Sequence, residues 1–258
     1  MKIQKAITPI KYPSFDPDAQ AFIIAASITN QIQKNAINTL VLGLKSDSLW
    51  TKMDAIYPFV GGNATSHSYN LKNTAQYQIS FSGSWTHSAT GAKPNGVNAF
   101  ANTNLNYSSV IGLNPTHYSL YSRTQIVESS FDMGCYAGGQ ENWMAVLYTP
   151  DVFYYYPNTS GIGPGGQTSS QGLFVGTFTS PTIKVFRNGN SVASTGSTTY
   201  NATNLNVYLG ATNTSTGAAL FSSKELAFCS IGDGLTDTDV TNLYNLVQTY
   251  NTTLSRQV

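Results

Sequence analysis

The glutamates are the side chains of this sequence most able to do chemistry, and they are Glu128, Glu141 and Glu225. Hydrolysis of a glycosidic bond needs two carboxyl groups that flank the bond, one as the acid and one as the base or nucleophile. The nearest approach to such a pair is Glu128 with Asp132, which would share one face of a strand. Because no second glutamate completes the arrangement, the spacing favours an exposed polar face, and we expect no enzymatic activity.

Metal ligands are equally sparse. The histidines are His67, His87 and His117. Each lies in a stretch rich in Ser and Thr, with no Cys, second His or carboxylate at ligand spacing, which favours a hydrogen-bonding role. Asp233, Asp237 and Asp239 could supply oxygens to calcium. Because Asp237 and Asp239 also fit the positive end of a helix, we expect no cofactor, and a structural calcium ion is the alternative.

Aromatic residues suggest a different kind of site, a platform on which sugar rings stack. Trp143 precedes the run Phe153–Tyr156. Strand alternation sends Tyr154 and Tyr156 to one face of a sheet and the other two rings to the opposite face, so that one pair belongs to the core. We therefore take Trp143, Tyr154 and Tyr156 as candidate glycan-binding residues.

Composition excludes several partners. The chain has 258 residues, with 13 Lys and Arg against 12 Asp and Glu and a charged fraction of only 10%. Without a basic run, neither nucleic acid nor an anionic membrane surface is an expected partner. The N-terminus lacks the apolar core of a signal peptide, and no apolar run could cross a bilayer, so we expect synthesis in a cytoplasm. There, Cys135 and Cys229 would be small buried hydrophobes.

The first 57 residues predict an extended arm followed by helices. The arm reaches about Tyr12, and helical patterns begin at Asp16 and at Thr29 or Asn30. A third helix is expected over 48–57, ended by Pro58. One face of the second helix is an apolar stripe that could mediate homo-oligomerisation or pack on the chain's own sandwich. The candidate interface residues are Ile32, Ile37, Leu40, Val41 and Leu44.

From Phe59 onward, short segments rich in Val, Thr, Tyr and Phe alternate with turns, which is typical of an all-β sandwich. The clearest hairpin joins two strands through Asn188-Gly189, the sequence favoured by a type I′ turn. The stretch Gly161–Gly166 lacks the Gly-Lys-Ser/Thr of a phosphate-binding loop and predicts a flexible loop. A final helix begins after Thr236, with Val240, Leu243, Val247, Tyr250 and Leu254 as its apolar stripe.

The order of these elements resembles a known fold. The segments Ile183–Ala193, Val207–Ala211 and Phe228–Tyr244 resemble the C-terminal half of the concanavalin A-like (laminin G/pentraxin-like) jelly roll. The resemblance implies a mainly β protein, an antiparallel jelly-roll β-sandwich with an N-terminal helical segment and a C-terminal helix. We divide the chain into an arm and helical assembly or anchoring segment, 1–58, and the jelly roll with its helix, 59–258.

A narrower resemblance concerns the segments Ala36–Gly62, Phe81–Ser88 and Gly91–Gly96, which look like the helical lead-in and jelly rolls of tailed-bacteriophage virion and fibre proteins. It implies a non-enzymatic virion structural protein, on the head, tail or a fibre, that forms homo-oligomers with other phage virion proteins as partners. The displayed domain could attach to a host-surface glycan. The alternatives are a carbohydrate-binding module without a structural role and, less favoured, a glycoside hydrolase.

Overall fold

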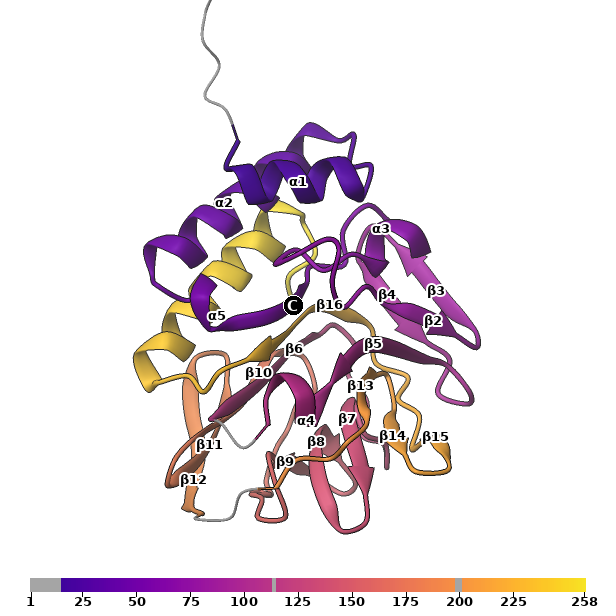
Figure 1. Cartoon of the computed structure of the whole chain (residues 1–258), viewed down its shortest axis with the longest axis vertical. Coiled ribbons are helices and arrows are strands. Elements are labelled where there is room, and N and C mark those ends of the chain that lie inside the picture. The colour runs from indigo at the N-terminus through magenta and orange to yellow at the C-terminus, as the bar shows by residue number, and fades with distance from the viewer. Residues whose placement is uncertain (1–14, 113–114, 198–200) are drawn as a thin grey trace, which may run out of the picture.

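The computed structural model describes residues 15–112, 115–197 and 201–258, and the predicted arm lies outside them. Within these residues the chain forms two β-sheets packed face to face, with helices over one of them (Figure 1). The predicted fold class is confirmed: a mainly β sandwich with helices at both ends of the chain. No described helix has the length and apolar character needed to cross a membrane.

The first sheet has eight described strands. In spatial order they are β12 (Asn190–Gly196), β11 (Thr182–Arg187), β10 (Gly172–Thr179), β6 (Thr116–Ser122), β16 (Leu226–Gly232), β4 (Gly91–Pro94) and β3 (Trp85–Ser88), with β1 (Met53–Tyr57) also paired to β16. All of these pairs are antiparallel. The predicted hairpin is β11–β12, in which Asn188 and Gly189 have φ values of 50° and 76°, as a type I′ turn requires.

The second sheet also has eight described strands. Its path is β15 (Gly217–Ala219), β14 (Thr212–Thr214), β7 (Met133–Ala137), β13 (Asn206–Leu209), β5 (Phe100–Asn106) and β2 (Ser80–Ser82), while β8 (Gln140–Tyr148) pairs with β7 and β9 (Val152–Tyr156) with β8. Among these described pairs β14 runs parallel to β7, so the sheet is mixed. The core between the two sheets includes Tyr57, Tyr118, Met144 and Phe174.

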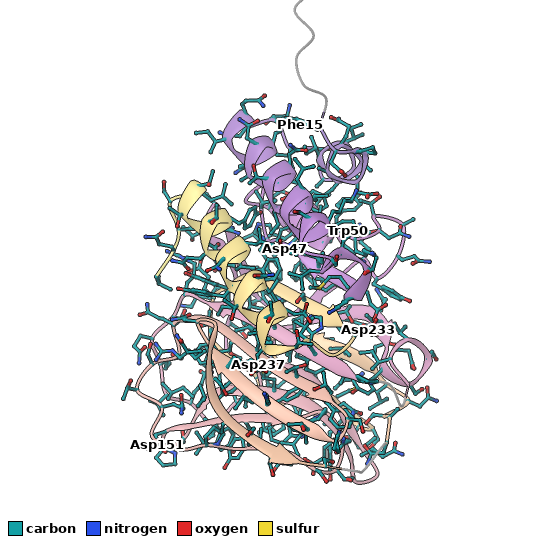
Figure 2. All side chains as sticks on the ribbon, turned by 90° about the vertical axis from the view of Figure 1, so that its left-hand side faces the viewer. Phe15, Asp47, Trp50, Asp151, Asp233 and Asp237 are labelled. Carbon is teal, nitrogen blue, oxygen red and sulfur yellow. The ribbon has the colours of Figure 1, made fainter. Side chains whose placement is uncertain are left out.

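Helices cover the outer face of the first sheet. They are α1 (Pro17–Ala25), α2 (Gln31–Ser46) and α5 (Asp237–Thr253); the shorter helices are the 3₁₀ turn η1 (Trp50–Lys52), α3 (Ala64–Ser68) and α4 (Tyr107–Val110). Figure 2 shows α2 and α5 side by side above that sheet. Asp16 and Thr236 cap α1 and α5, as the sequence predicts, and of the two candidates for the start of α2 the cap is Asn30.

The apolar stripe of α2 faces the chain's own core. Ile37, Leu40, Val41 and Leu44 are buried in one cluster with Leu243 and Val247 of α5 and Phe228 of β16. These four side chains cannot also meet a second copy without unpacking this core, so the oligomer-interface prediction is wrong for them, and packing on the chain's own sandwich is the correct alternative. Ile32, the fifth candidate, is 58% exposed.

The third predicted helix is wrong, because residues 53–57 form strand β1. Ala55 and Tyr57 enter the core between the sheets, whereas Met53 and Ile56 enter the core beneath the helices. A strand buried on both faces shows no polar alternation, and its apolar spacing is then indistinguishable from that of a buried helix. Residue 58, the boundary predicted between the helical segment and the jelly roll, directly follows the last residue of strand β1.

Arg256 joins the C-terminal segment to this strand. Its guanidinium is fully buried, and it donates to the carbonyls of Phe59, Pro58 and Ala227 at 2.6, 2.8 and 2.8 Å. Nε donates to Asn251 at 2.8 Å. Four oxygens therefore solvate a buried cation and fix the end of α5 to β16 and to the residues that follow β1.

Candidate functional site

Strands β7, β8 and β9 carry an aromatic cluster on the outer face of the second sheet. Alternation sends Phe153 and Tyr155 into the core, where both are fully buried, and leaves Tyr154 and Tyr156 half-buried on the opposite face. Trp143 pairs with Tyr156 across β8 and β9, so the three candidate residues share that face. The structure therefore brings the predicted glycan-binding residues together.

Trp143 is the centre of a stack of rings. Phe131 lies parallel to it at 3.9 Å between ring centroids, and Tyr156 does so at 4.4 Å. Both rings belong to the part of the chain that the structure describes, and they make no ring contact with each other. Phe131 and Tyr156 therefore flank opposite faces of the indole. Trp143 is only 8% exposed and cannot offer a face to a ligand. Its N–H donates to Glu141 at 3.1 Å.

Glycines make room for this stack. A Cβ on Gly161 would lie 2.4 Å from the Tyr156 ring, and one on Gly163 would lie 2.3 Å from the Tyr154 ring. The segment that carries these glycines pairs with β9, since Tyr155 and Ile162 exchange backbone hydrogen bonds of 3.0 Å. The prediction of a flexible loop is therefore wrong for this part of Gly161–Gly166, because glycine here accommodates large rings on the neighbouring strand.

A hollow of about 320 Å³ opens beside the stack. We call it the aromatic pocket; it is lined by Phe131, Tyr136, Glu141, Trp143, Thr212, Thr214 and Leu220. Tyr136 and Leu220 are 40% and 42% exposed, and they provide the accessible surface that Trp143 lacks. The carboxylate of Glu141 and the hydroxyl of Thr214 add hydrogen-bonding groups at its wall, whereas the hydroxyl of Thr212 is buried.

The sequence prediction missed Phe131, Tyr136 and Leu220. Tyr136 lies on the outer face of β7, since Met133 and Cys135 of that strand face the core. Assigning the inward and outward residues of this strand from the sequence would have identified it. Phe131 and Leu220 come from irregular segments that carry no periodic signal, and they meet through a hydrogen bond from the Phe131 N–H to the Leu220 carbonyl at 2.8 Å.

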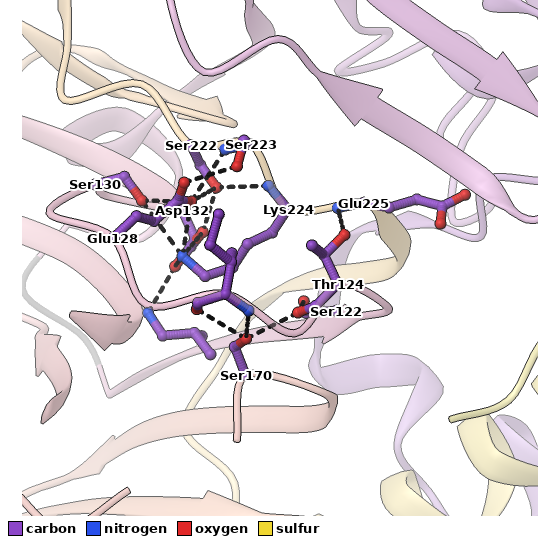
Figure 3. A network of polar contacts seen from close by, with 12 residues as sticks. Ser122, Thr124, Glu128, Ser130, Asp132, Ser170, Ser222, Ser223, Lys224 and Glu225 are labelled. Atoms are coloured by element: carbon purple, nitrogen blue, oxygen red, sulfur yellow. Dashed lines mark hydrogen bonds and ion pairs between the residues drawn. The ribbon is translucent and has the colours of Figure 1, made fainter. Parts of the chain in front are cut away.

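A buried polar network holds these two irregular segments together (Figure 3). Lys224 is fully buried, and its ammonium lies 3.0 Å from Glu128 and 3.2 Å from Asp132. Ser222 donates to Asp132 at 2.7 Å and Ser223 to Glu128 at 2.7 Å. The acidic pair is therefore real, but the expectation of an exposed polar face is wrong, because a buried lysine from a distant segment neutralises it.

Burial and Lys224 act in opposite directions on this pair. Burial raises the pKa of Glu128, but the charge of Lys224 and the hydrogen bonds from Ser223 outweigh it and bring the pKa down to about 2. Burial dominates at Asp132 and raises its pKa. The oxygens of both carboxylates are occupied by Lys224, serines and the backbone N–H of Val146, at 2.6 Å from Asp132.

The remaining glutamates also have partners. Glu225 accepts from Arg123 at 2.8 Å and from Thr90 at 2.6 Å. Glu141 accepts from Trp143, and burial raises its pKa despite that bond.

The histidines and the aspartates proposed for calcium lie elsewhere. His67 and His87 are paired through their Nδ1 atoms at 2.9 Å, a contact that their separation in sequence concealed. His117 bonds to the Asp233 carbonyl and to Ser230. Among the residues that the structure describes, no group of three or more His, Cys, Asp or Glu is placed to hold a metal ion.

Each aspartate of the predicted final helix has a lysine partner. Asp237 contacts Lys184 at 2.7 Å, and Asp239 contacts Lys52 at 2.6 Å. Asp239 also accepts from the backbone N–H of Thr236, which completes a capping box. The two carboxylates thus serve the start of α5, as the favoured interpretation holds.

Comparisons with known proteins identify similar folds but no relative in sequence. No family model matches the sequence, and no match to a curated protein was found. The structure is similar to a Trypanosoma rangeli sialidase mutant with trans-sialidase activity, at a TM-score of 0.58 and 12% identity over 82% of this chain and 39% of that one. It is also similar to T. rangeli sialidase in complex with sialic acid, at a TM-score of 0.56 and 11% identity over 81% of this chain and 38% of that one.

Botulinum neurotoxin type C, whose cell entry depends on interaction with two ganglioside molecules, is similar at a TM-score of 0.57 and 11% identity, over 79% of this chain and 53% of that one. This chain therefore covers less than two thirds of each of these proteins. At such identities the likeness establishes a shared β-sandwich, and the function has to be argued from the site.

Proposed function

We propose that this protein is a non-catalytic, lectin-like module that binds a saccharide in the aromatic pocket. The observation that carries the proposal is the accessible ring and side-chain surface of Tyr136 and Leu220 beside a rigid stack of rings. Sugar rings have apolar faces that pack on such surfaces, and their hydroxyls need a few polar groups at the edge. Glu141 and Thr214 provide these groups.

Rigidity favours binding here. Phe131 is held by the Trp143 stack on one side and by its backbone bond to Leu220 on the other. The Lys224 network fixes both segments before any ligand arrives. A ligand that meets an ordered surface loses less free energy to side-chain ordering than one that must organise the surface itself.

The non-catalytic character is part of the proposal. A glycosidase needs two carboxyl groups free to exchange protons and to approach the bond. Glu128 and Asp132 are instead occupied by Lys224, and Glu225 by Arg123. Glu141 faces the aromatic pocket without a second carboxylate among its lining residues. If Glu141→Gln or Glu128→Gln abolished a measurable turnover of polysaccharide, the hydrolase alternative would replace this one.

The two similar proteins support the class of ligand by analogy. The sialidase structure contains sialic acid, and the neurotoxin interacts with gangliosides. Both ligands are sugars or carry them, which agrees with a saccharide as the ligand of this chain.

Binding to an oligosaccharide array, followed by calorimetric titration of the best ligand, tests the proposal. Tyr136→Ala and Leu220→Ala should each weaken binding by about tenfold, because the truncated side chains supply the packing surface. Leu42→Ala is a matched control, since Leu42 is 50% exposed on α2 and lies outside the pocket. Equal effects of Leu220→Ala and Leu42→Ala, or no saccharide ligand at all, would refute the proposal.

We further propose that the module is displayed on a phage particle, as the resemblance of residues 36–62 implies. Immunogold electron microscopy of purified particles, with antibody against residues 59–258, tests this point. Labelling at the head, tail or fibre supports display on the virion. Unlabelled particles that also lack its peptides by mass spectrometry would leave a carbohydrate-binding module without a structural role.

A further inference from the structure

Glu141 is the single charged residue in the eight described strands of the second sheet. The other residues of these strands are apolar side chains, glycines, hydroxyls and amides. The first sheet differs, because its strands include Asp54, Lys93, Lys184 and Arg187. On the second sheet, a partner of opposite charge for Glu141 therefore cannot come from a neighbouring strand.

Strand pairing places Glu141 at the wall of the aromatic pocket. Tyr136 of β7 lies directly opposite Glu141, and Thr214 of β14 is in turn paired with Tyr136. Paired residues of neighbouring strands project to the same face of a sheet, so the three side chains form one row across β8, β7 and β14 (Figure 1). Met133 and Cys135 of β7 face the core, so this row lies on the outer face. All three of its residues line the pocket.

The carboxylate of Glu141 has one unoccupied oxygen. Its Oε2 atom accepts from the Trp143 N–H at 3.1 Å, whereas Oε1 makes no recorded hydrogen bond with a described residue. The other two glutamates each have a basic partner, at 3.0 and 2.8 Å, but Glu141 has none among the described residues, and no basic residue lines the pocket. Burial raises the pKa of Glu141, and only the bond from Trp143 acts against it. A cation is therefore what this carboxylate lacks.

Aromatic rings flank the position that a group bound to this oxygen would take. The Cβ atoms of directly paired strand residues are about 5 Å apart, so a cation at Glu141 lies within cation–π range of Tyr136. The N–H bond holds Trp143 against the carboxylate, and its stacked partner Phe131 also lines the pocket. A carboxylate beside such rings attracts a cation both by its charge and through the ring quadrupole, whereas it repels an anion.

We propose that the aromatic pocket is selective for an amino sugar, a saccharide unit whose amine is free and protonated. The apolar face of the sugar packs on Tyr136 and Leu220, and its ammonium group donates to Oε1 of Glu141. This inference rests on the proposed function and names the class of saccharide that the pocket takes. N-acetylation of the amine removes the charge, and a sugar carboxylate would face Glu141, so both kinds of sugar should bind more weakly.

The indole ¹⁵N–¹H signals of the full-length protein report binding at this pocket. Trp143 donates to Glu141, whereas Trp50 and Trp85 lie outside the pocket and serve as internal references. The main probes are the free-amine, N-acetyl and hydroxyl forms of one oligosaccharide, in the gluco and the galacto series, titrated at mildly acidic pH. A sialyl oligosaccharide supplies a carboxylate, and a short lysine peptide supplies an amine without a sugar. We expect the free-amine form of at least one series to shift the Trp143 signal at the lowest concentration.

Glu141→Gln tests the charge. Glutamine keeps an oxygen that accepts from the Trp143 N–H, so the variant removes the charge and retains the shape of the wall. The wild type should bind the free-amine form roughly five- to twentyfold more tightly than the acetylated or hydroxyl form, because a partly exposed ion pair and a cation–π contact each contribute a few-fold. This preference should disappear in Glu141→Gln, and it should decrease in the wild type at about 0.5 M salt.

Asp47→Asn is the matched control. It also removes one negative charge, but Asp47 lies at the end of α2, outside the pocket, and has no ion pair among the described residues. The preference for the free amine should therefore persist in Asp47→Asn. Equal loss of the preference in both variants would show that the net charge of the protein, and not Glu141, sets it.

The outcomes separate this inference from the proposed function. Equal affinity for the three forms, tightest binding of the sialyl probe or an unchanged preference in Glu141→Gln overturns the selectivity for an amine. In each of these cases a shift of the Trp143 signal by a sugar leaves the proposed function standing. If no saccharide shifts that signal, the proposed function fails and this inference fails with it. A lysine peptide that binds as tightly as the amino sugar overturns the saccharide as the ligand class.

Discussion

The outer faces of the two sheets differ in what covers them. On the first sheet, Tyr121, Val175 and Phe228 belong to one core with buried side chains of α1, α2 and α5. On the second sheet, Tyr154 packs against Tyr156 and Tyr208 against Phe100, and all three tyrosines remain partly exposed. Apolar side chains on the first face contribute to stability through burial, whereas those on the second face remain available to a ligand.

The network beneath the aromatic pocket offers the strongest test of this difference. Lys224→Met leaves Glu128 and Asp132 in a buried site without their cation, and we expect a loss of about 3 to 5 kcal/mol in the free energy of unfolding. Chemical denaturation measures it. Lys184→Met removes the surface pair with Asp237 and should cost less than about 1 kcal/mol. Similar losses in both variants would contradict the structural importance of the network.

Two leucines of one helix compare the covered surface with an exposed one. Leu40 is fully buried beneath α5, whereas Leu42 is 50% exposed. Leu40→Ala should lower the free energy of unfolding by about 3 kcal/mol, because it opens a cavity. Leu42→Ala should change it by about 0.5 kcal/mol or less. If Leu42→Ala were the more damaging, or if it changed the mass measured by light scattering, α2 would contact a second chain through its exposed face.

The open face depends on its glycines. Gly161→Ala would push the Tyr156 ring off Trp143, and we expect a loss of about 1 to 2 kcal/mol together with a weaker near-ultraviolet circular dichroism signal. Gly165→Ala meets only the end of the Asp151 side chain and should be nearly neutral. An unchanged dichroism spectrum in Gly161→Ala would show that the stack does not need this glycine.

The smallest effect concerns pH. Burial lowers the pKa of His117 to about 4 against an ordinary 6.5, despite its bond to the Asp233 carbonyl. The unfolded chain therefore takes up a proton below pH 6.5 that the folded protein refuses, so stability falls as the pH falls from 6.5 toward 4. Between pH 7 and pH 5.5 this group should cost about 1 kcal/mol. Denaturation of wild type and His117→Gln at both pH values measures the difference, and identical pH dependence would contradict it.

Local patterns predicted much of this structure. The caps at Asp16, Asn30 and Thr236, the Asn188-Gly189 turn and the stripe of α5 depend on neighbouring residues, so the sequence contains them directly. The alternation of Phe153–Tyr156 also identified which rings face outward. Cys135 and Cys229 are free and buried, as expected.

Long-range contacts account for what the sequence could not supply. Lys224 neutralises Glu128 from 96 positions away, and β1 becomes a strand because β16 offers it a free edge. Phe131 and Leu220 become neighbours through a single backbone hydrogen bond between two irregular segments. Whether the apolar stripe of α2 packs internally or on a second copy depends on the position of α5, which comes from the other end of the chain. None of these facts has a periodic signature, because each depends on two segments far apart in the chain.

The Arg256 clamp has a consequence for the speed of folding. Its bonds to Phe59 and Pro58 close loops of 197 and 198 positions, so the chain loses most of its conformational freedom before this contact can form. Proteins dominated by such distant pairings fold on the order of milliseconds to seconds. We therefore expect Arg256→Ala mainly to accelerate unfolding in stopped-flow experiments, since a contact completed late leaves the rate of the earlier steps unchanged.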